Sequence, residues 1–288
     1  MALVLFLLTL YGMPKIKIYT RSFSPELYRL SKGLYPEGVE AVRLTDRSAD
    51  GYFYAMLRDK ECDIAINIDE DAFVTDPDAV MALAQRVYEE GWANAGASDC
   101  GPGCPRSHNP IVTNPFFNIL NLKLIREKYE GSGQIRAFDY NPVKEQMKEA
   151  FLEQVSETLN GDFDIYDFEP YYSFYLWLAH NFKTLYLPAR RHRDGMSTIL
   201  SDGSGHDLCM HSWMARKYKV QMDQTYRIDS LINEAYALRG ISRPQFSGWN
   251  QLGFALEMGC GYIKKAFIRV VRWPGKLRRK MRHIREKA

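Results

Sequence analysis

The sequence predicts an α/β protein with a mainly parallel central sheet flanked by helices. Short β-branched strands alternate with helical segments through about the first ninety residues, which is typical of a parallel sheet with helices on its faces. The run DIAINI at residues 63–68 is nearly apolar throughout, as in a strand that is buried on both sides. A strongly signalled helix begins after Asp76, a good N-cap residue, with Pro77 at its first position.

The elements expected before this helix are two further strands and a short helix. Residues 15–20 and 39–45 carry the β-branched pattern of strands, and a short helix is expected at about 50–59. The N-terminal apolar run, about eleven residues long, is too short to span a bilayer and lacks the flanks of a signal peptide. We expect it to be a buried strand or helix.

The chain beyond the helix that starts at Asp76 is expected to begin with a loop. Gly91 ends that helix, and residues 93–115 are rich in Gly, Pro, Asn and Ser, which indicates a long loop. The elements expected after it are a strand entering a helix (116–125), an amphipathic helix (143–159), an aromatic helix (169–181), a short strand (183–189), a flexible loop (201–206) and a segment of helical spacing (206–218).

Charge is distributed unevenly along the 288 residues. The chain holds 38 basic and 35 acidic residues, for a net charge of +3. Residues 264–288 contain eleven Lys or Arg and one acid, Glu286. The remaining body therefore holds 27 basic and 34 acidic residues, and the sequence reads as an acidic body with a basic tail.

The five cysteines form no regular framework. Cys100 and Cys104 lie in the segment CGPGC, which could form a local disulfide or half of a zinc site. No second Cys or His pair has matching spacing, so we interpret the cysteines as ordinary thiols in a reducing compartment.

Two carboxylates close the strand at 63–68. Alternate side chains of an extended segment point the same way, so Asp69 and Asp71 can converge while Glu70 faces elsewhere. Neighbouring carboxylates repel each other when partly buried unless a positive charge lies between them. The pattern predicts a site for Mn²⁺ or Mg²⁺ that also takes phosphate oxygens; the plainer alternative is an acidic turn capped by water.

Two other motifs can be compared with the same residues. An EF-hand loop needs Asp or Asn and then Gly at the fifth and sixth positions, where this chain has Phe73 and Val74. A phosphatase of the haloacid dehalogenase type also begins with a strand and Asp-x-Asp. That phosphatase stays an alternative, with Asp69 as the nucleophile.

The segment Asn67-Ile68-Asp69-Glu70-Asp71-Ala72-Phe73, followed by a helix at Asp76-Pro77, resembles the metal-binding segment of GT-A glycosyltransferases. The likeness covers roughly residues 14–220. It implies a nucleotide-sugar-binding half at 1–125, an acceptor-binding half of the same domain at 126–255 and a basic amphipathic tail at 256–288.

The resemblance implies roles for further residues. Thr20, Arg21 and Asp46, at the ends of the first two strands, would contact the nucleotide. His211, with His206 as second choice, would be the third metal ligand. Arg191, with Arg190 and Arg193, would add positive charge at the phosphates. If the reaction inverts the anomeric centre, Glu169 would be the base that deprotonates the acceptor hydroxyl, with Asp194 and Asp167 as rivals; the sequence leaves inversion and retention open.

The function implied is transfer of a sugar from a UDP- or GDP-type nucleotide diphosphate donor to a glycan or lipid-linked acceptor, in surface polysaccharide synthesis. The loop 201–206 would be a lid over the donor. The alternatives from other classes are a metal-dependent phosphate-ester hydrolase and a non-catalytic module that binds a membrane surface.

The basic tail at 264–288 predicts attachment to an anionic membrane surface. Apolar residues recur between its Lys and Arg residues from Phe267 to Ile284, with Trp273 suited to the headgroup region. Nucleic acid would be attracted by the same charges but has no use for the apolar residues. We therefore expect a cytoplasmic protein, peripherally associated with the inner face of the membrane.

Overall fold

A computed structural model describes residues 13–45, 48–99, 109–154, 165, 169–264 and 266–267 of the chain. Several sequence predictions lie outside these residues: the N-terminal apolar run, the CGPGC segment, the roles of Asp46 and Asp167, and the tail from residue 268 onward. No helix within the described ranges is both long and apolar enough to cross a membrane. The described cysteines Cys62, Cys209 and Cys260 are free thiols.

The main sheet has six strands in the order β2-β1-β3-β6-β5-β7. The pairs β1–β2, β1–β3 and β5–β7 are parallel, and β6 runs antiparallel to both of its neighbours. This confirms the predicted α/β fold with a mainly parallel sheet. The strands are β1 (Ile16–Arg21), β2 (Glu40–Leu44), β3 (Ile64–Ile68), β5 (Asn94–Ser98), β6 (Thr113–Asn121) and β7 (Thr184–Tyr186).

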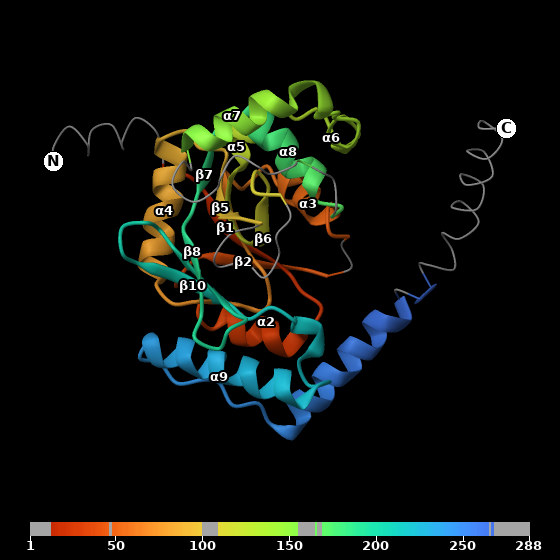
Figure 1. Ribbon diagram of the computed structural model, residues 1–288. Coiled ribbons are helices and arrows are strands. Elements are labelled where there is room, and N and C mark those ends of the chain that lie inside the picture. Colours follow the sequence, from red (N-terminus) through yellow and green to blue (C-terminus); the bar gives the residue numbers. More distant parts are fainter. Residues whose placement is uncertain are drawn as a thin grey trace.

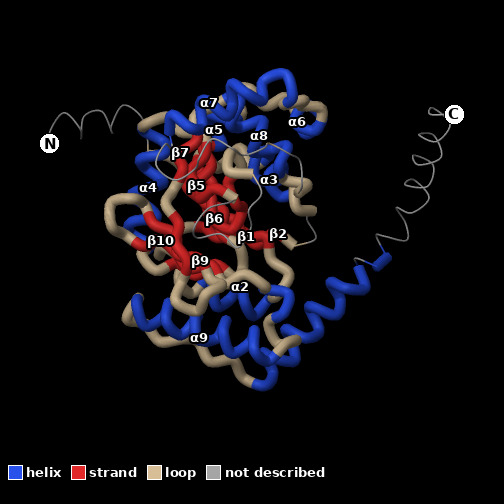
Figure 2. The backbone as a smooth tube through the Cα atoms, in the orientation of Figure 1, coloured by secondary structure: helices blue, strands red, loops and turns tan. Residues whose placement is uncertain are grey.

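Helices cover both faces of this sheet (Figures 1 and 2). Ile64 and Ile66 of β3 lie in one buried cluster and Ala65 in the other, because successive side chains of a strand point to opposite faces. The first cluster includes residues of α2 (Pro25–Lys32), α4 (Pro77–Glu89) and α9 (Met222–Leu238). The second includes residues of α3 (Gly51–Arg58), α5 (Leu122–Ile125), α6 (Ser132–Arg136), α7 (Lys144–Gln154) and α8 (Tyr172–Asn181).

A second, antiparallel sheet has the strand order β4-β10-β9-β8. Its strands are β4 (Ala72–Val74), β10 (Asp207–His211), β9 (Thr198–Ser201) and β8 (Ala189–Arg191). The helical spacing predicted for 206–218 is therefore wrong, since residues 207–211 form a strand. A short apolar run fits a strand and a helix equally well by period, and here β4 and β9 bind β10 on both sides.

The loop predicted at 93–115 is also wrong in part. Asn94–Ser98 form β5, which pairs with β6 and β7. The composition NAGAS hid this strand, because small and polar residues are uncommon in strands. Gly96 is required there by close packing, since a Cβ at this position would collide with the Asn118 side chain.

The C-terminal part of the described chain is helical. The helix α9 packs beside α2 (Figure 1), and Tyr236 donates a hydrogen bond to the Leu30 carbonyl (2.8 Å). A further helix, called the C-terminal helix below, spans residues 248–264. Two one-turn 3₁₀ helices complete the described elements, at Asn141–Val143 and Ala215–Lys217.

Candidate functional site

The predicted metal ligands lie where the two sheets meet. Asp69 follows β3 directly, Asp71 precedes β4, and His211 ends β10 opposite Ala72 of β4. Arg21 ends β1, the parallel neighbour of β3, so it lies at the same edge of the main sheet. Polar groups at the carboxyl edge of parallel strands are where ligands of α/β proteins bind.

Asp69 carries a carboxylate oxygen with no partner. Its Oδ1 is buried and makes no hydrogen bond with the described residues. Burial raises the pKa of Asp69 to about 6, a shift that the charge of Arg21 opposes and that of Asp71 reinforces. The guanidinium of Arg21 lies 5.3 Å above the centre of the Tyr52 ring. The position therefore favours a positive charge at Asp69 beyond the one that Arg21 supplies.

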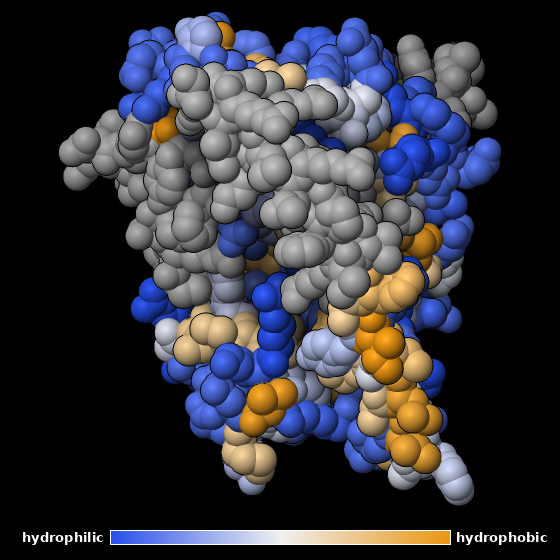
Figure 3. Space-filling model, turned by 90° about the vertical axis from the view of Figure 1, so that its right-hand side faces the viewer, coloured by the Kyte–Doolittle hydropathy of each residue, from blue (hydrophilic) through white to orange (hydrophobic). Residues whose placement is uncertain are grey.

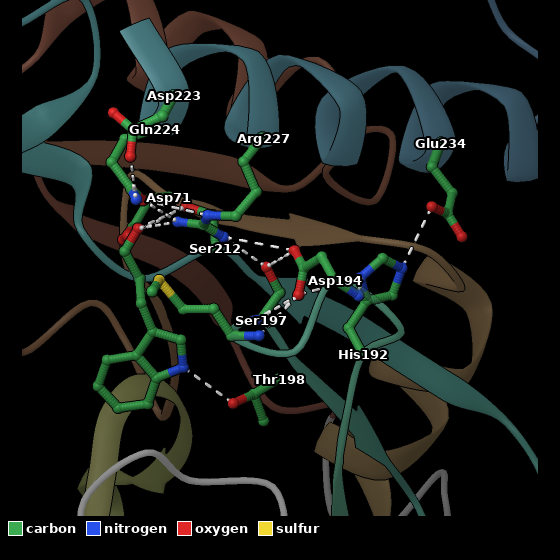
Figure 4. Close-up of polar contacts among 12 residues, drawn as sticks. Asp71, His192, Asp194, Ser197, Thr198, Ser212, Asp223, Gln224, Arg227 and Glu234 are labelled. Atoms are coloured by element: carbon green, nitrogen blue, oxygen red, sulfur yellow. Dashed lines mark hydrogen bonds and ion pairs between the residues drawn. The ribbon is translucent and has the colours of Figure 1, made fainter. Parts of the chain in front are cut away.

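Asp71 and His211 form a buried pair. His211 Nε2 lies 3.4 Å from Asp71 Oδ1, and the Ser212 hydroxyl donates to Asp71 Oδ2 (3.3 Å; Figure 4). Burial alone would raise the pKa of Asp71, but His211 and these hydrogen bonds outweigh it and lower the pKa. The imidazole of His211 stacks on Phe116 with 4.4 Å between ring centres. Its Nδ1 is buried without a hydrogen-bond partner in the described chain.

Glu70 points away from this pair, as the sequence predicts. Its Oε2 accepts hydrogen bonds from the Ser22 hydroxyl (2.8 Å) and from the backbone N–H groups of Phe23 (2.8 Å) and Ser24 (2.6 Å). Burial raises the pKa of Glu70 to about 7 against these hydrogen bonds. Glu70 thus holds the connection between β1 and α2, and with it the end of the strand that carries Arg21.

The turn after His211 adopts an uncommon backbone conformation. Trp213 and Met214 have φ of 58° and 60°, in the left-handed region that costs non-glycine residues roughly 1–2 kcal/mol. The Trp213 ring lies 4.5 Å from the His211 ring, and its indole N–H donates to Thr198 Oγ1 (2.9 Å). This turn therefore packs an aromatic ring against the imidazole.

Arg227 of α9 holds this turn in place, a role that the sequence did not reveal. Its guanidinium donates to the carbonyl of Trp213 (3.3 Å), to the Ser197 hydroxyl (2.8 Å) and to Gln224 (3.0 and 3.1 Å; Figure 4). The apolar spacing of Ile228, Leu231, Ile232 and Ala235 is the signal that would have predicted α9, and with it an arginine next to the buried face of this helix.

Asp194, a predicted catalytic base, is fully engaged in a turn. Its carboxylate accepts from the backbone N–H groups of Met196 (2.9 Å) and Ser197 (2.7 Å) and from the Ser197 hydroxyl (2.6 Å). Arg227 Nη1 lies 3.4 Å away. Burial opposes ionisation, but the hydrogen bonds with Ser197 and Met196 hold the pKa of Asp194 well below its usual range. A carboxylate of this kind binds a proton weakly, so the geometry gives Asp194 a structural role.

The predicted arginine cluster separates into different environments. Arg190 donates to Asp207 from both terminal guanidinium nitrogens, and Arg193 binds Glu234 (2.8 Å). Arg191 is exposed and stands opposite Thr198, which in turn stands opposite His211. Residues opposite each other in neighbouring strands share a face of the sheet. Arg191 therefore lies on the His211 side, about 10 Å from it between Cα atoms.

Other predicted residues are placed differently. The Thr20 hydroxyl is buried and hydrogen-bonds with Tyr35 (2.6 Å), which makes it part of the core rather than of a nucleotide site. Glu169 lies just before α8, where its carbonyl accepts from the N–H of Tyr172 (2.9 Å). Its role as a base stays a prediction.

Asp99, which follows β5, is a buried carboxylate that the sequence reading missed. It accepts hydrogen bonds from Tyr172 (2.5 Å) and Tyr171 (3.3 Å) of the aromatic helix and from Asn114. Its position directly after a strand was the available signal, but β5 itself was not predicted.

The unpartnered polar atoms at this edge of the sheet are of the types that bind divalent cations. Asp69 Oδ1 and His211 Nδ1 are buried atoms without partners, and carboxylate oxygen and imidazole nitrogen are both metal ligands in proteins. In the parts of the chain that are described, no three His, Cys, Asp or Glu side chains already surround one point as ligands of an ion do. The metal site therefore stays a prediction that these orphaned atoms favour.

No protein-family model matches the sequence, and no curated protein matches it. Among solved structures, a galactosyltransferase, LgtC, in complex with donor and acceptor sugar analogues is 11% identical, with a TM-score of 0.33 over 75% of this chain and 96% of that one. An active-site mutant of LgtC is 12% identical, with a TM-score of 0.28 over 59% and 72%. The structure of A197 from STIV is 15% identical, with a TM-score of 0.30 over 41% and 70%. Scores this low assign no activity to the chain.

Proposed function

We propose that the protein is a metal-dependent glycosyltransferase that takes a sugar from a UDP- or GDP-type nucleotide diphosphate and passes it to a glycan or lipid-linked acceptor. The observation that carries this proposal is the unpartnered Asp69 carboxylate oxygen beside the Asp71–His211 pair, at the carboxyl edge of a mainly parallel sheet. Two carboxylates and an imidazole with a free nitrogen favour binding of a divalent cation. A divalent cation at the carboxyl edge of the sheet would in turn favour binding of phosphate oxygens.

The ligands of the cation would be Asp69, Asp71 and His211. A bound Mn²⁺ or Mg²⁺ would neutralise charge on the departing nucleoside diphosphate. Arg21 lies near Asp69, where its charge opposes the rise in the pKa of Asp69 that burial causes, so it can attract the same phosphates. Arg191 is exposed on the His211 side of the second sheet, and its guanidinium can add to this positive field.

The group transfer needs an acceptor for one proton. The bond between the sugar and the phosphate oxygen breaks, a bond from the sugar to the acceptor oxygen forms, and the acceptor hydroxyl gives its proton to a carboxylate. Glu169 is the proposed base if the reaction inverts the anomeric centre. Asp194 is the weaker candidate for the base, because its carboxylate already accepts several hydrogen bonds and its low pKa disfavours protonation.

Thermal unfolding with nucleotides tests the proposal. We expect UDP or GDP, added with Mn²⁺ at about a hundred times the dissociation constant, to raise the unfolding midpoint by about 5–8 °C. Without metal, the same nucleotide should give little shift. Asp69→Asn and Asp71→Asn should each abolish the metal-dependent part.

A matched control is Asp78→Asn, which changes an exposed carboxylate in the first turn of α4 and should leave the shift intact. A nucleotide shift that is equal with and without metal, or that survives Asp69→Asn, would contradict the proposal. Release of nucleoside diphosphate that requires an acceptor would then separate transfer from hydrolysis.

A further inference from the structure

One face of the C-terminal helix is docked on the body of the protein. Phe254 is buried and meets Phe246 edge to face, with 5.1 Å between ring centres. Farther along, Glu257 forms an ion pair with Arg43 of β2, and Tyr262 packs against Phe23 with 4.8 Å between ring centres. The helix is thus held at several points along its length.

The opposite face of the same helix is apolar and exposed. Trp249, Leu252, Leu256 and Ile263 expose 82%, 50%, 61% and 73% of their surface, and Phe267 just beyond exposes 68%. At about 100° per residue these five positions fall within an arc of about 60°, and they extend over about 27 Å. We call these five residues the apolar stripe. Hydrophobic side chains gather along the lower right of the space-filling view (Figure 3).

The apolar stripe is continuous and uncharged. No Lys, Arg, Asp or Glu lies on its arc among the described residues 248–264, because Glu257 is turned toward Arg43. Single exposed apolar residues are ordinary on a soluble protein, but a contiguous row marks a contact surface. Exposure of this face to water is therefore unfavourable, and covering it would stabilise the protein.

We propose that the apolar stripe docks on an anionic lipid surface, with the helix lying in the plane of the interface. Basic residues follow the apolar stripe at once in the sequence, since residues 264–288 hold eleven Lys or Arg and one acid. Anionic lipid attracts nearby basic residues, and apolar side chains on one helix face insert at the headgroup boundary.

The charge of the chain disfavours the other occupants of this surface. A second copy would bring the same surplus of about ten positive charges to the interface, and like charges oppose such a contact. Nucleic acid would attract the charges but offers nothing apolar to a row of Trp, Leu, Ile and Phe. An anionic membrane satisfies both the charge and the apolar side chains.

Docking in this way would also orient the proposed active site, a consequence that rests on the proposed function, unlike lipid binding itself. The docked face of the helix contacts Phe23 after β1 and Arg43 in β2, beside a pocket of about 230 Å³. These residues belong to the edge of the sheet that carries Arg21. A membrane-bound helix would therefore keep this edge near lipid-linked acceptors.

Vesicle sedimentation of the full chain tests the proposal. We expect binding to vesicles of phosphatidylcholine with phosphatidylglycerol, and at least tenfold weaker binding for the double variant Leu256→Ser, Ile263→Ser. The matched control is Val220→Ser with Met222→Ser, which changes two residues that are 73% and 63% exposed outside the apolar stripe and should bind like the wild type. Unchanged far-ultraviolet circular dichroism and unfolding midpoint show that each variant is folded.

Equal binding by the apolar-stripe variant and the wild type would overturn the proposal. So would a change of oligomeric state in that variant with lipid binding intact, because the apolar stripe would then contact a second copy. The metal-dependent nucleotide shift, measured without lipid, should be the same in the apolar-stripe variant. Failure of the transferase proposal would remove that shift and leave vesicle binding as it was.

Discussion

At the scale of single residues, Asp69 and Asp71 are two carboxylates with opposite surroundings. Burial raises the pKa of Asp69 to about 6 despite the charge of Arg21. For Asp71, His211 and Ser212 overcome the effect of burial and lower the pKa. A cation would compete with a proton at Asp69 and would find Asp71 already ionised. In the absence of a cation, Asp69 is thus harder to ionise than an ordinary aspartate, and Asp71 is easier to ionise.

We predict that Asp69→Asn stabilises the metal-free protein. A pKa raised from 3.8 to about 6 means that the ionised side chain costs folding free energy, fully above pH 6 and progressively less as the pH falls toward 3.8. The variant should gain up to about 3 kcal/mol at pH 7.5. Urea unfolding in EDTA at pH 7.5 and pH 5 measures this, and the gain should be smaller at pH 5.

A loss of stability in Asp69→Asn at pH 7.5 would show that the carboxylate is stabilising without metal. Asp78→Asn is again the control, since its side chain is exposed at the start of α4. It should change the free energy of unfolding by no more than about 0.5 kcal/mol.

Arg227 and Arg193 allow a comparison of a buried arginine with an exposed one. The side chain of Arg227 is 13% exposed and bridges α9 to the turns at 194–197 and 213. That of Arg193 is 79% exposed in its pair with Glu234. We predict that Arg227→Lys costs about 2–3 kcal/mol, because lysine cannot satisfy these several acceptors. Arg193→Lys should cost less than about 0.5 kcal/mol.

Chemical denaturation of the two variants checks this difference. Equal costs for the two substitutions would show that the buried contacts of Arg227 add nothing to stability. Weaker Mn²⁺-dependent nucleotide binding in folded Arg227→Lys would show in addition that the turn after His211 supports the site.

At the scale of elements, α4 is the helix that the sequence predicted best. Asp76 accepts a hydrogen bond from the N–H of Ala79 (2.9 Å), and Pro77 is the first helical residue. The same carboxylate lies 3.0 Å from His206, which ties the loop 201–206 to the start of α4. The cap thus supports both the helix and the loop that was predicted to be a lid.

We predict that Asp76→Ala lowers the free energy of unfolding by about 1 kcal/mol. The lost acceptor leaves a helix N–H unsatisfied and releases His206. Asp78→Ala, two residues on, should change it by less than about 0.5 kcal/mol. Thermal and urea unfolding of both variants at pH 7 provide the measurement, and equal effects would mean that the cap contributes nothing beyond its charge.

The sequence predicted elements whose signals are local. The strands at β1, β2 and β3 and the helices α3 and α4 all appear near their expected positions, because their periodicity and capping are encoded in adjacent residues. The strands β5 and β10 were missed or mistaken because partners far along the chain stabilise them. Asn94 pairs with Leu120 and Thr184, and Met210 pairs with Phe73.

The candidate site shows the same division. The two aspartates could be predicted as carboxylates that follow a buried strand. The alternation expected for residues 69–71 is wrong, because Glu70 and Asp71 form a turn in which the N–H of Ala72 donates to the Asp69 carbonyl (3.0 Å). The contact of Asp71 with His211 depends on the β4–β10 pairing, which no local pattern reveals. Arg227 and Trp213 come together only through packing of α9 against the second sheet, so their contact could not be predicted even where the apolar spacing indicates the helix.

At the scale of the whole molecule, the C-terminal helix is attached to the body less extensively than α9. Phe254 is its one buried residue within 248–264, and Gln251, Glu257 and Tyr262 add contacts nearer the surface, whereas five residues of α9 are buried. Segments with few buried contacts open with little free energy, independently of global unfolding. The lipid-docking surface and the body can therefore respond separately to substitutions.

We predict that Phe254→Ala raises hydrogen exchange of amides in residues 248–264 by about tenfold or more. The unfolding midpoint of the body should shift by less than about 2 °C. Leu256→Ala removes a side chain from the exposed face and should leave exchange unchanged. Exchange measured by mass spectrometry decides, and protection of residues 248–264 equal to that of α9 in Phe254→Ala would contradict the prediction.

The left-handed turn at Trp213 and Met214 places the Trp213 ring against the His211 imidazole. Two residues with φ near +60° store free energy that the contacts of Arg227 and Thr198 keep from being released. Glycine at position 214 would relieve the backbone strain at this residue and would also make the turn more flexible. A variant chosen for heat resistance would then orient the His211 imidazole less precisely. Selection for thermal stability and selection for a precisely oriented imidazole would therefore favour different residues in this turn.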